Sequence, residues 1–195
     1  MAERDAKKAK HGARKGPKKV SEAYLERAAL HYLGRFSSTE ANLRAVLERK
    51  IRRRNEDNAA PTDEQRRWVD TVVAKCVRYG YVDDTNYARS RIDALVRKGK
   101  PVRMIVQDLR YKGVPSDIAE AALNELRQDE DRDADRQAAA AYARRRRFGP
   151  FRRADRNADE KIEKEKAAMM RAGFSFSLIK ETLEATEEEL LDLLP

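Results

Sequence analysis

The sequence predicts an all-α protein, and three observations lead to this class. Charged residues make up 39% of the 195 residues and the mean hydropathy is -0.88, which leaves little apolar material for a large core. Glycine and proline, the residues least suited to helix interiors, number only eight and six. Apolar residues recur at spacings of three and four between recognisable helix starts and stops. The pattern predicts three tandem three-helix repeats that form an elongated, curved rod.

The first element is a basic N-terminal arm, residues 1–20. It carries eight Lys or Arg against two acidic residues and almost no large apolar side chains. Such a segment cannot bury enough surface to offset its chain entropy, so it is predicted to be disordered. Its charge suits non-specific attraction to DNA.

The first predicted repeat covers residues 21–83. Its three apolar stripes run over residues 24–33, 43–51 and 68–76. Ser37 and Glu40 have the spacing of a capping box before the second stripe, and Thr62 and Gln65 have it before the third. Gly80 is predicted to end the third helix.

The second and third repeats are predicted at residues 84–130 and 131–186, followed by an acidic C-terminal tail at 187–195. Their six apolar stripes run over residues 87–96, 102–109, 118–126, 138–144, 162–170 and 178–183. Gly113 and Gly173 stand 60 residues apart in matching contexts, each followed by an apolar residue and a new N-cap. Both predict tight corners between helices, so Gly113→Val is expected to destabilise the middle repeat. The tail is predicted to be either a frayed amphipathic helix or an acidic arm that docks on a basic surface.

The segment Tyr79-Gly80-Tyr81-Val82-Asp83-Asp84-Thr85-Asn86-Tyr87-Ala88-Arg89 resembles the signature of the RecX family, and similarity extends from about residue 23 to residue 186. The residues that carry this signature are Gly80, Tyr81, Asp83, Asp84, Tyr87, Gly113, Gly173 and Phe174. The resemblance implies a three-repeat α fold and a regulator that binds the RecA recombinase filament on DNA and lodges in its groove. It also implies inhibition of ATP hydrolysis and strand exchange, and hence modulation of recombination, DNA repair and the SOS response.

A net charge of +9 favours phosphate-rich partners, and one arginine run stands out. Arg144 to Arg147 span more than one helical turn, so they cannot all pair with carboxylates on one face of the protein. The alternative for each basic cluster is a solvated helix face or end. The candidate residues for binding a partner or DNA are Arg144, Arg145, Arg146, Arg147, Arg152, Arg153, Lys98, Lys100, Arg103, Arg110, Lys112, Arg52 and Arg53. Phe148 and Phe151 are interpreted as core residues in preference to base-stacking ones.

The sequence predicts neither catalysis nor a metal or other cofactor. Asp83 and Asp84 are better explained as helix caps than as cation ligands, and Cys76 as a small buried residue than as a nucleophile. Trp68, Met169 and Met170 are predicted to be core residues. Without a signal peptide or an apolar run of membrane length, a monomeric cytoplasmic protein is expected.

Two other functions remain open. One is a basic helical-repeat protein that binds DNA or RNA directly. A RecX-like regulator, by contrast, is expected to bind single- and double-stranded DNA only weakly or indirectly. The other is a scaffold that bridges proteins through Tyr and Leu faces.

Overall fold

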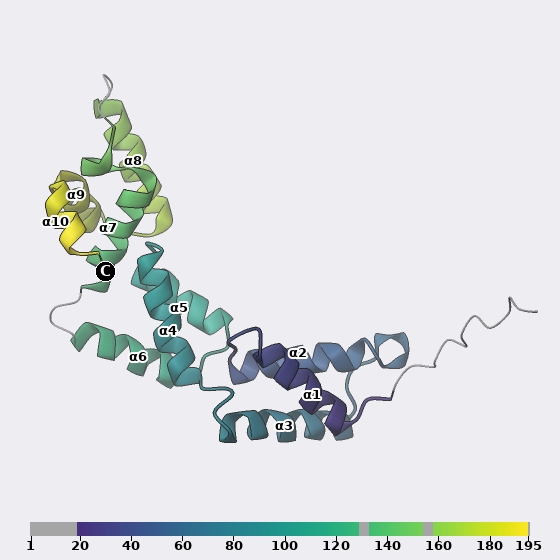
Figure 1. Ribbon diagram of the computed structural model, residues 1–195. Helices are drawn as coiled ribbons and strands as arrows, with labels where there is room; N and C mark the ends of the chain where they lie inside the picture. Colours follow the sequence, from purple (N-terminus) through teal and green to yellow (C-terminus); the bar gives the residue numbers. More distant parts are fainter. Residues whose placement is uncertain (1–18, 129–132, 154–157, 195) are drawn as a thin grey trace, which may run out of the picture. The chain divides into compact units, whose positions relative to one another are not determined.

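The computed structural model describes residues 19–128, 133–153 and 158–194, and helices account for the regular structure in these ranges (Figure 1). The prediction of an all-α fold is therefore confirmed. The α-helices are α1 Glu22–Leu33, α2 Glu40–Arg52, α3 Asp63–Arg78, α4 Asp84–Arg97, α5 Val102–Tyr111, α6 Ser116–Gln128, α7 Ala134–Arg146, α8 Ala158–Ala172, α9 Phe176–Glu184 and α10 Glu187–Asp192. Two 3-10 turns, η1 Glu56–Asn58 and η2 Gly149–Phe151, join them. The predicted disordered arm lies outside the described residues except for 19 and 20.

The helices form two compact units. The first contains the described residues up to Phe36 and Leu43–Tyr81, and the second contains Ser37–Asn42 and the described residues from Val82 onward. The three-repeat boundaries and the curved rod remain predictions.

The first unit packs α1 and α3 together with most of α2. Leu25, Leu47 and Val72 are fully buried at its centre. Outside this core, the ammonium group of Lys75 on α3 lies 3.0 Å from a carboxylate oxygen of Glu22 on α1. Apolar burial is the main source of stability here, because half-exposed ion pairs contribute little.

Local sequence signals account for the ends of α3. Thr62 and Gln65 form the predicted capping box, in which each side chain accepts from the backbone N–H of the other. Gly80 follows the helix in the left-handed conformation (φ 71°). Cys76 is buried as predicted, and burial raises the pKa of its thiol, which disfavours the nucleophilic thiolate.

In the second unit, α7 is the central helix. It lies against α4, α9 and α10 (Figure 1). Its buried face consists mainly of alanine. Ala138, Ala139, Ala140 and Ala143 are fully buried, so neighbouring helices approach the α7 backbone closely. A core of side chains from α4, α5, α6, α8 and α9 surrounds it.

The signature segment around residues 80–89 builds the start of the second unit. The Asp83 carboxylate accepts from the N–H of Asn86 at 2.9 Å and caps α4. The buried Asp84 carboxylate accepts from the N–H of Glu40, the first residue of α2, at 3.0 Å. Asp83 therefore caps its own helix, as predicted, whereas Asp84 is the first residue of α4 and its carboxylate binds the start of α2. Arg89 adds a bidentate pair with Glu125 of α6.

Two local predictions are wrong. Thr39, not Ser37, caps α2: its hydroxyl accepts from the N–H of Asn42 at 3.1 Å and donates to the carbonyl of Lys112 at 2.6 Å. Met170 is 53% exposed, because adjacent helical residues point about 100° apart and Met169 takes the buried position. Trp68 is half-buried.

Asp84→Asn is expected to raise the unfolding midpoint at pH 7. Burial raises the pKa of the Asp84 carboxyl, while the hydrogen bond from Glu40 opposes that shift. The carboxyl of Asp84 therefore holds its proton more tightly in the folded protein than in the unfolded chain. The stability of the wild-type protein consequently falls as the pH rises from the pKa of Asp84 in the unfolded chain through its higher pKa in the folded protein. Asparagine keeps the acceptor oxygen and cannot ionise.

Urea unfolding followed by circular dichroism at pH 7 and near pH 3 measures this effect. The advantage of Asp84→Asn should shrink toward the acidic pH. A variant that is less stable than wild type at pH 7 would contradict this account of Asp84.

Candidate functional site

The corner between α4 and α5 rests on the backbone of α7. Gly99 has φ 68°, and a Cβ atom built on it would lie 2.7 Å from the backbone nitrogen of Tyr142. Only glycine permits this approach. Beside it, the Arg145 guanidinium donates to the carbonyl of Lys98 at 2.6 Å. The structure thus brings the exposed Lys98 and Lys100 next to the arginine run, 47 residues away in sequence.

The arginine run ends α7. Arg144, Arg145 and Arg146 occupy the last helical turn, Arg147 is the C-cap, and all four are exposed. The guanidinium carbons of Arg145 and Arg146 lie 5.6 and 5.8 Å from the ring centroid of Tyr142. Among the described residues, no carboxylate forms an ion pair with any of the four. Their charge is therefore presented to solvent.

Arg152 differs from its neighbours because it has an internal partner. Its guanidinium makes two hydrogen bonds to Glu165 of α8, at 2.7 and 2.6 Å. The Glu165 carboxylate is 7% exposed and also accepts from the N–H of Gly149 at 3.0 Å. The hydrogen bonds to Glu165 raise the pKa of Arg152. This pair anchors the turn after α7 to α8, while Arg153 remains exposed.

The remaining candidates of the second unit lie along α5. The Arg103 side chain covers Gly173, where a Cβ atom would lie 2.7 Å from its Nε. Arg110 is seven residues further on, roughly 10 Å along the helix axis. Next to it, the Lys112 ammonium lies 5.5 Å from the ring centroid of Tyr111, which is 85% exposed. Arg103 therefore lies near the start of α5, whereas Arg110 lies in its last turn and Lys112 directly follows it.

Arg52 and Arg53 belong to the first unit, at the end of α2 and just after it. Both are exposed. The structure thus divides the candidate residues between the two units.

Aromatic residues near the arginine run belong to the core, as predicted. Phe148 packs against both core clusters of the second unit, and Phe151 against the smaller one. Tyr142 makes edge-to-face contacts with Phe148 and with the buried Phe174, at centroid distances of 6.0 and 5.5 Å. These contacts hold the end of α7 in place.

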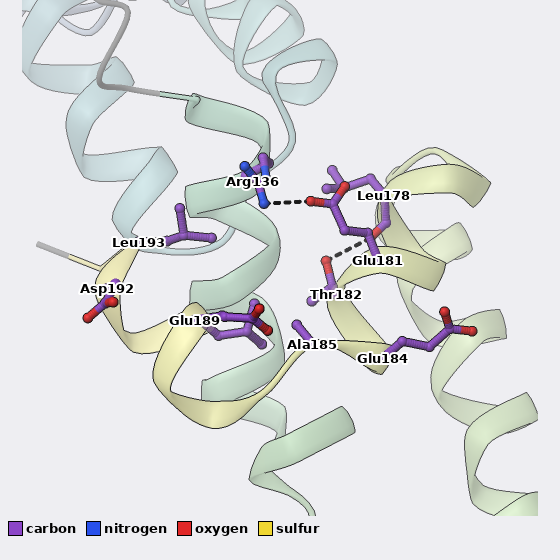
Figure 2. A pocket seen from close by; sticks show the side chains of 10 residues that line it. Arg136, Leu178, Glu181, Thr182, Glu184, Ala185, Glu189, Asp192 and Leu193 are labelled. Carbon is purple, nitrogen blue, oxygen red and sulfur yellow. Dashed lines mark hydrogen bonds and ion pairs between the residues drawn. The ribbon is translucent and has the colours of Figure 1, made fainter.

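The acidic C-terminal segment forms a cleft of about 530 Å³ with α7 and α9 (Figure 2). Glu181 of α9 pairs with Arg136 of α7 at 2.6 Å, as the dashed line in Figure 2 marks. Glu189 completes a capping box with Thr186 at the start of α10. Leu190 is buried against alanines of α7, so this segment is a packed helix and not a frayed one.

Within the described part of the chain, no group of three His, Cys, Asp or Glu side chains is placed to hold a metal ion. No helix among residues 19–128, 133–153 and 158–194 is long and apolar enough to cross a membrane.

Comparison with known proteins decides the family. The family model described as "RecX, second three-helix domain" matches residues 83–123, which correspond to α4, α5 and most of α6. The regulatory protein RecX of Myxococcus xanthus is 36% identical over 178 residues, covering 91% of this chain and 94% of the relative. The chain belongs to the RecX family. RecX of Agrobacterium fabrum is 34% identical and covers 88% of both chains.

Solved RecX structures share the fold. The crystal structure of RecX from Lactobacillus salivarius superposes with a TM-score of 0.58 over 87% of this chain and 96% of that one, at 22% identity. A second RecX crystal structure gives a TM-score of 0.54 at 21% identity. In the RecX family signature of this chain, Asp83 and Asp84 bind the N-terminal N–H groups of helices. Tyr87 packs against the core, and Gly113 forms the corner after α5.

Sequence reasoning missed several residues that shape the site in this RecX-family chain. Tyr142 supports the α4–α5 corner, and Glu165 holds Arg152. Lys161 and Lys164 join Arg147 around one pocket. No short-range pattern could have identified Glu165, because its partner lies 13 residues earlier in a different element. The Ala-rich stretch before Tyr142 was the one available sign of close packing around α7.

Proposed function

We propose that this RecX-family chain is a non-catalytic regulator that binds the RecA recombinase filament on DNA and inhibits its ATP hydrolysis and strand exchange. The observation that supports it most is the exposed arginine run, which lies beside Lys98 and Lys100 and has no described carboxylate paired with it. A filament on DNA offers phosphates and carboxylates, the groups that arginine recognises best. Regulation by binding needs no catalytic group.

The residues proposed for binding are the predicted basic ones, and they contribute to binding in different ways. Arg144 to Arg147, Lys98, Lys100 and Arg153 are exposed and contact the partner. Arg103, Arg110 and Lys112 extend this contact within the second unit, and Arg152 acts mainly through its pair with Glu165. Arg52 and Arg53 make a contact of their own from the first unit. The protein acts as a cytoplasmic monomer without a cofactor.

Changing Arg144, Arg145, Arg146 and Arg147 together to Glu is expected to raise the concentration for half-inhibition of RecA about tenfold or more, equivalent to about 1.4 kcal/mol of binding. Helical content should stay nearly unchanged, because exposed charges contribute little to folding. ATP turnover by RecA assembled on single-stranded DNA is the measurement.

A charge-matched control changes four exposed cations elsewhere: Arg27, Arg67, Arg78 and Lys180 to Glu. It should inhibit RecA as wild type does. The proposal fails if wild-type protein at stoichiometric ratio leaves ATP turnover and strand exchange unaffected. A loss of helical circular dichroism signal in the arginine variant would instead show that these arginines stabilise the fold.

The same arginines support direct binding to DNA or RNA as a second candidate function. Titration of nucleic acid without recombinase separates the two. High affinity with a steep dependence on salt favours direct binding, since each phosphate contact releases counterions.

A further inference from the structure

The cleft between α7, α9 and α10 has a charge opposite to that of the whole protein. On a chain with a net charge of +9, its charged lining consists of four carboxylates and one guanidinium: Glu181, Glu184, Glu189, Asp192 and Arg136. Leu178, Ala185 and Leu193 add apolar surface beside them. The exposed Glu187 and Glu188 continue the acidic surface along α10. The cleft therefore favours a cationic ligand that also has aliphatic surface.

Two of the four carboxylates have no described partner. Glu181 pairs with Arg136 at 2.6 Å, and Glu189 is held in the capping box of α10. Glu184 and Asp192 are exposed, and no described cation pairs with either. Their charges are therefore open to a ligand.

The C-terminal ends of α9 and α10 provide an independent observation. The last turns of α1, α2, α3, α4, α5, α7 and α8 each contain a basic residue, which offsets the partial negative charge of a helix C-terminus. The last turns of α9 and α10 contain none, and these helices end instead in Glu184 and Asp192. Both residues line the cleft, so a cation bound there would supply the charge that these two helix ends lack.

The spread of the carboxylates indicates the form of the cation. Among the described residues, no three acidic side chains converge on a metal ion, and Figure 2 shows Glu184 and Asp192 at opposite edges of the cleft. A ligand that reaches both must carry several charges along its length. A Lys- or Arg-rich polypeptide has this form, and the aliphatic stems of its side chains can pack on apolar surface such as that of Leu193.

The chain itself contains a segment of this chemistry. The basic N-terminal arm carries eight Lys or Arg against two acidic residues, whereas residues 181–195 carry six acidic residues and no basic one. The two segments therefore have net charges of equal size and opposite sign. Of the arm, residues 1–18 lie outside the described residues. Charge complementarity thus favours the arm as the occupant of the cleft.

We propose that the acidic cleft binds the basic N-terminal arm of this chain, with Lys or Arg side chains of the arm contacting Glu184 and Asp192. Phosphate-rich partners compete with the cleft for the same cations, so a bound arm attracts nucleic acid less strongly than a free one. The contact is an autoinhibitory one that weakens as salt increases. It is independent of the regulation of RecA, and its test requires neither recombinase nor nucleic acid.

Carbodiimide cross-linking of the full-length protein at low salt tests the contact directly, because this reagent joins a lysine to a carboxylate only where the two groups touch. Mass spectrometry of the monomer fraction should find links from arm lysines, such as Lys8 and Lys15, to Glu184 or Asp192. Raising the salt concentration should remove them. A monomer fraction without such links would overturn the proposal. Links found only in dimers would also overturn it, since they would assign the cleft to a second copy.

A variant separates binding in the cleft from other contacts of the arm. Glu184→Gln combined with Asp192→Asn should make trypsin cleave within the full-length protein's arm about fivefold faster, because two exposed ion pairs no longer hold it. Early arm fragments measured by mass spectrometry give this rate. The thermal midpoint should not fall, because both carboxylates lie at helix C-termini without a described partner.

The matched control is Glu64→Gln combined with Glu120→Gln, which also removes two exposed carboxylates without a described partner. Its arm should be cleaved at the wild-type rate. Cleavage of the cleft variant at the wild-type rate would contradict the proposal, as would an equal acceleration in the control.

Discussion

Gly113→Ala is expected to lower the free energy of unfolding of the second unit by about 2–5 kcal/mol. Gly113 has φ 76°, and a Cβ atom there would lie 2.6 Å from the Cβ of Ala41 in the first turn of α2. Alanine therefore adds a strained dihedral angle and a collision with a packed helix. Urea unfolding followed by circular dichroism measures the loss.

Two companion variants separate these causes. Gly80 has a similar φ of 71° but no atom within 4 Å of the added Cβ, so Gly80→Ala carries the dihedral cost alone, about 1–2 kcal/mol. In a double-mutant cycle, combining Ala41→Gly with Gly113→Ala should restore the part of the unfolding free energy that Gly113→Ala loses through the clash with Ala41. Equal losses in Gly80→Ala and Gly113→Ala would show that the contact with Ala41 is unimportant.

Arg152→Ala should destabilise the second unit by about 3–5 kcal/mol, because it leaves the carboxylate of Glu165 buried without its cation. Glu165 would keep only the N–H of Gly149 as a partner. Thermal unfolding and the urea midpoint both report the change. The effect is large because the pair is nearly buried, with side-chain exposures of 20% and 7%.

The matched control is Arg89→Ala. Arg89 also forms a bidentate pair, with Glu125, but both side chains are half exposed, so solvent and salt weaken the interaction. Its loss should leave the midpoint almost unchanged. Arg152→Met combined with Glu165→Gln should restore much of the stability lost in Arg152→Ala. If Arg152→Ala is no worse than Arg89→Ala, the anchoring role of Arg152 is wrong.

The fold was predictable where its signals are local. Helix caps and corner glycines act over three to five residues, so Thr62, Asp83 and Gly113 could be assigned from their neighbours alone. The cap of α2 could not, because Ser37, Ser38 and Thr39 are chemically similar candidates. The carbonyl of Lys112, 73 residues away, holds Thr39 at that position.

The candidate site was predictable in composition but not in arrangement. Charge identified Arg144 to Arg147 and Lys98 separately, yet their proximity depends on the approach of Gly99 to Tyr142. Charge also could not distinguish Arg152 from Arg153. One is paired with a nearly buried glutamate on another helix, and the other is exposed. Such differences depend on tertiary packing, which a single sequence encodes only indirectly.

The alanine face of α7 also bears on how this protein can diverge. A helix packed through methyl groups has no room for bulkier side chains, so Ala138 to Ala140 should tolerate little variation. The exposed arginines that follow on the same helix are under no such steric restriction. Specificity for different partners can therefore evolve, or be engineered, at one end of α7 while the packing along the rest of the helix is preserved.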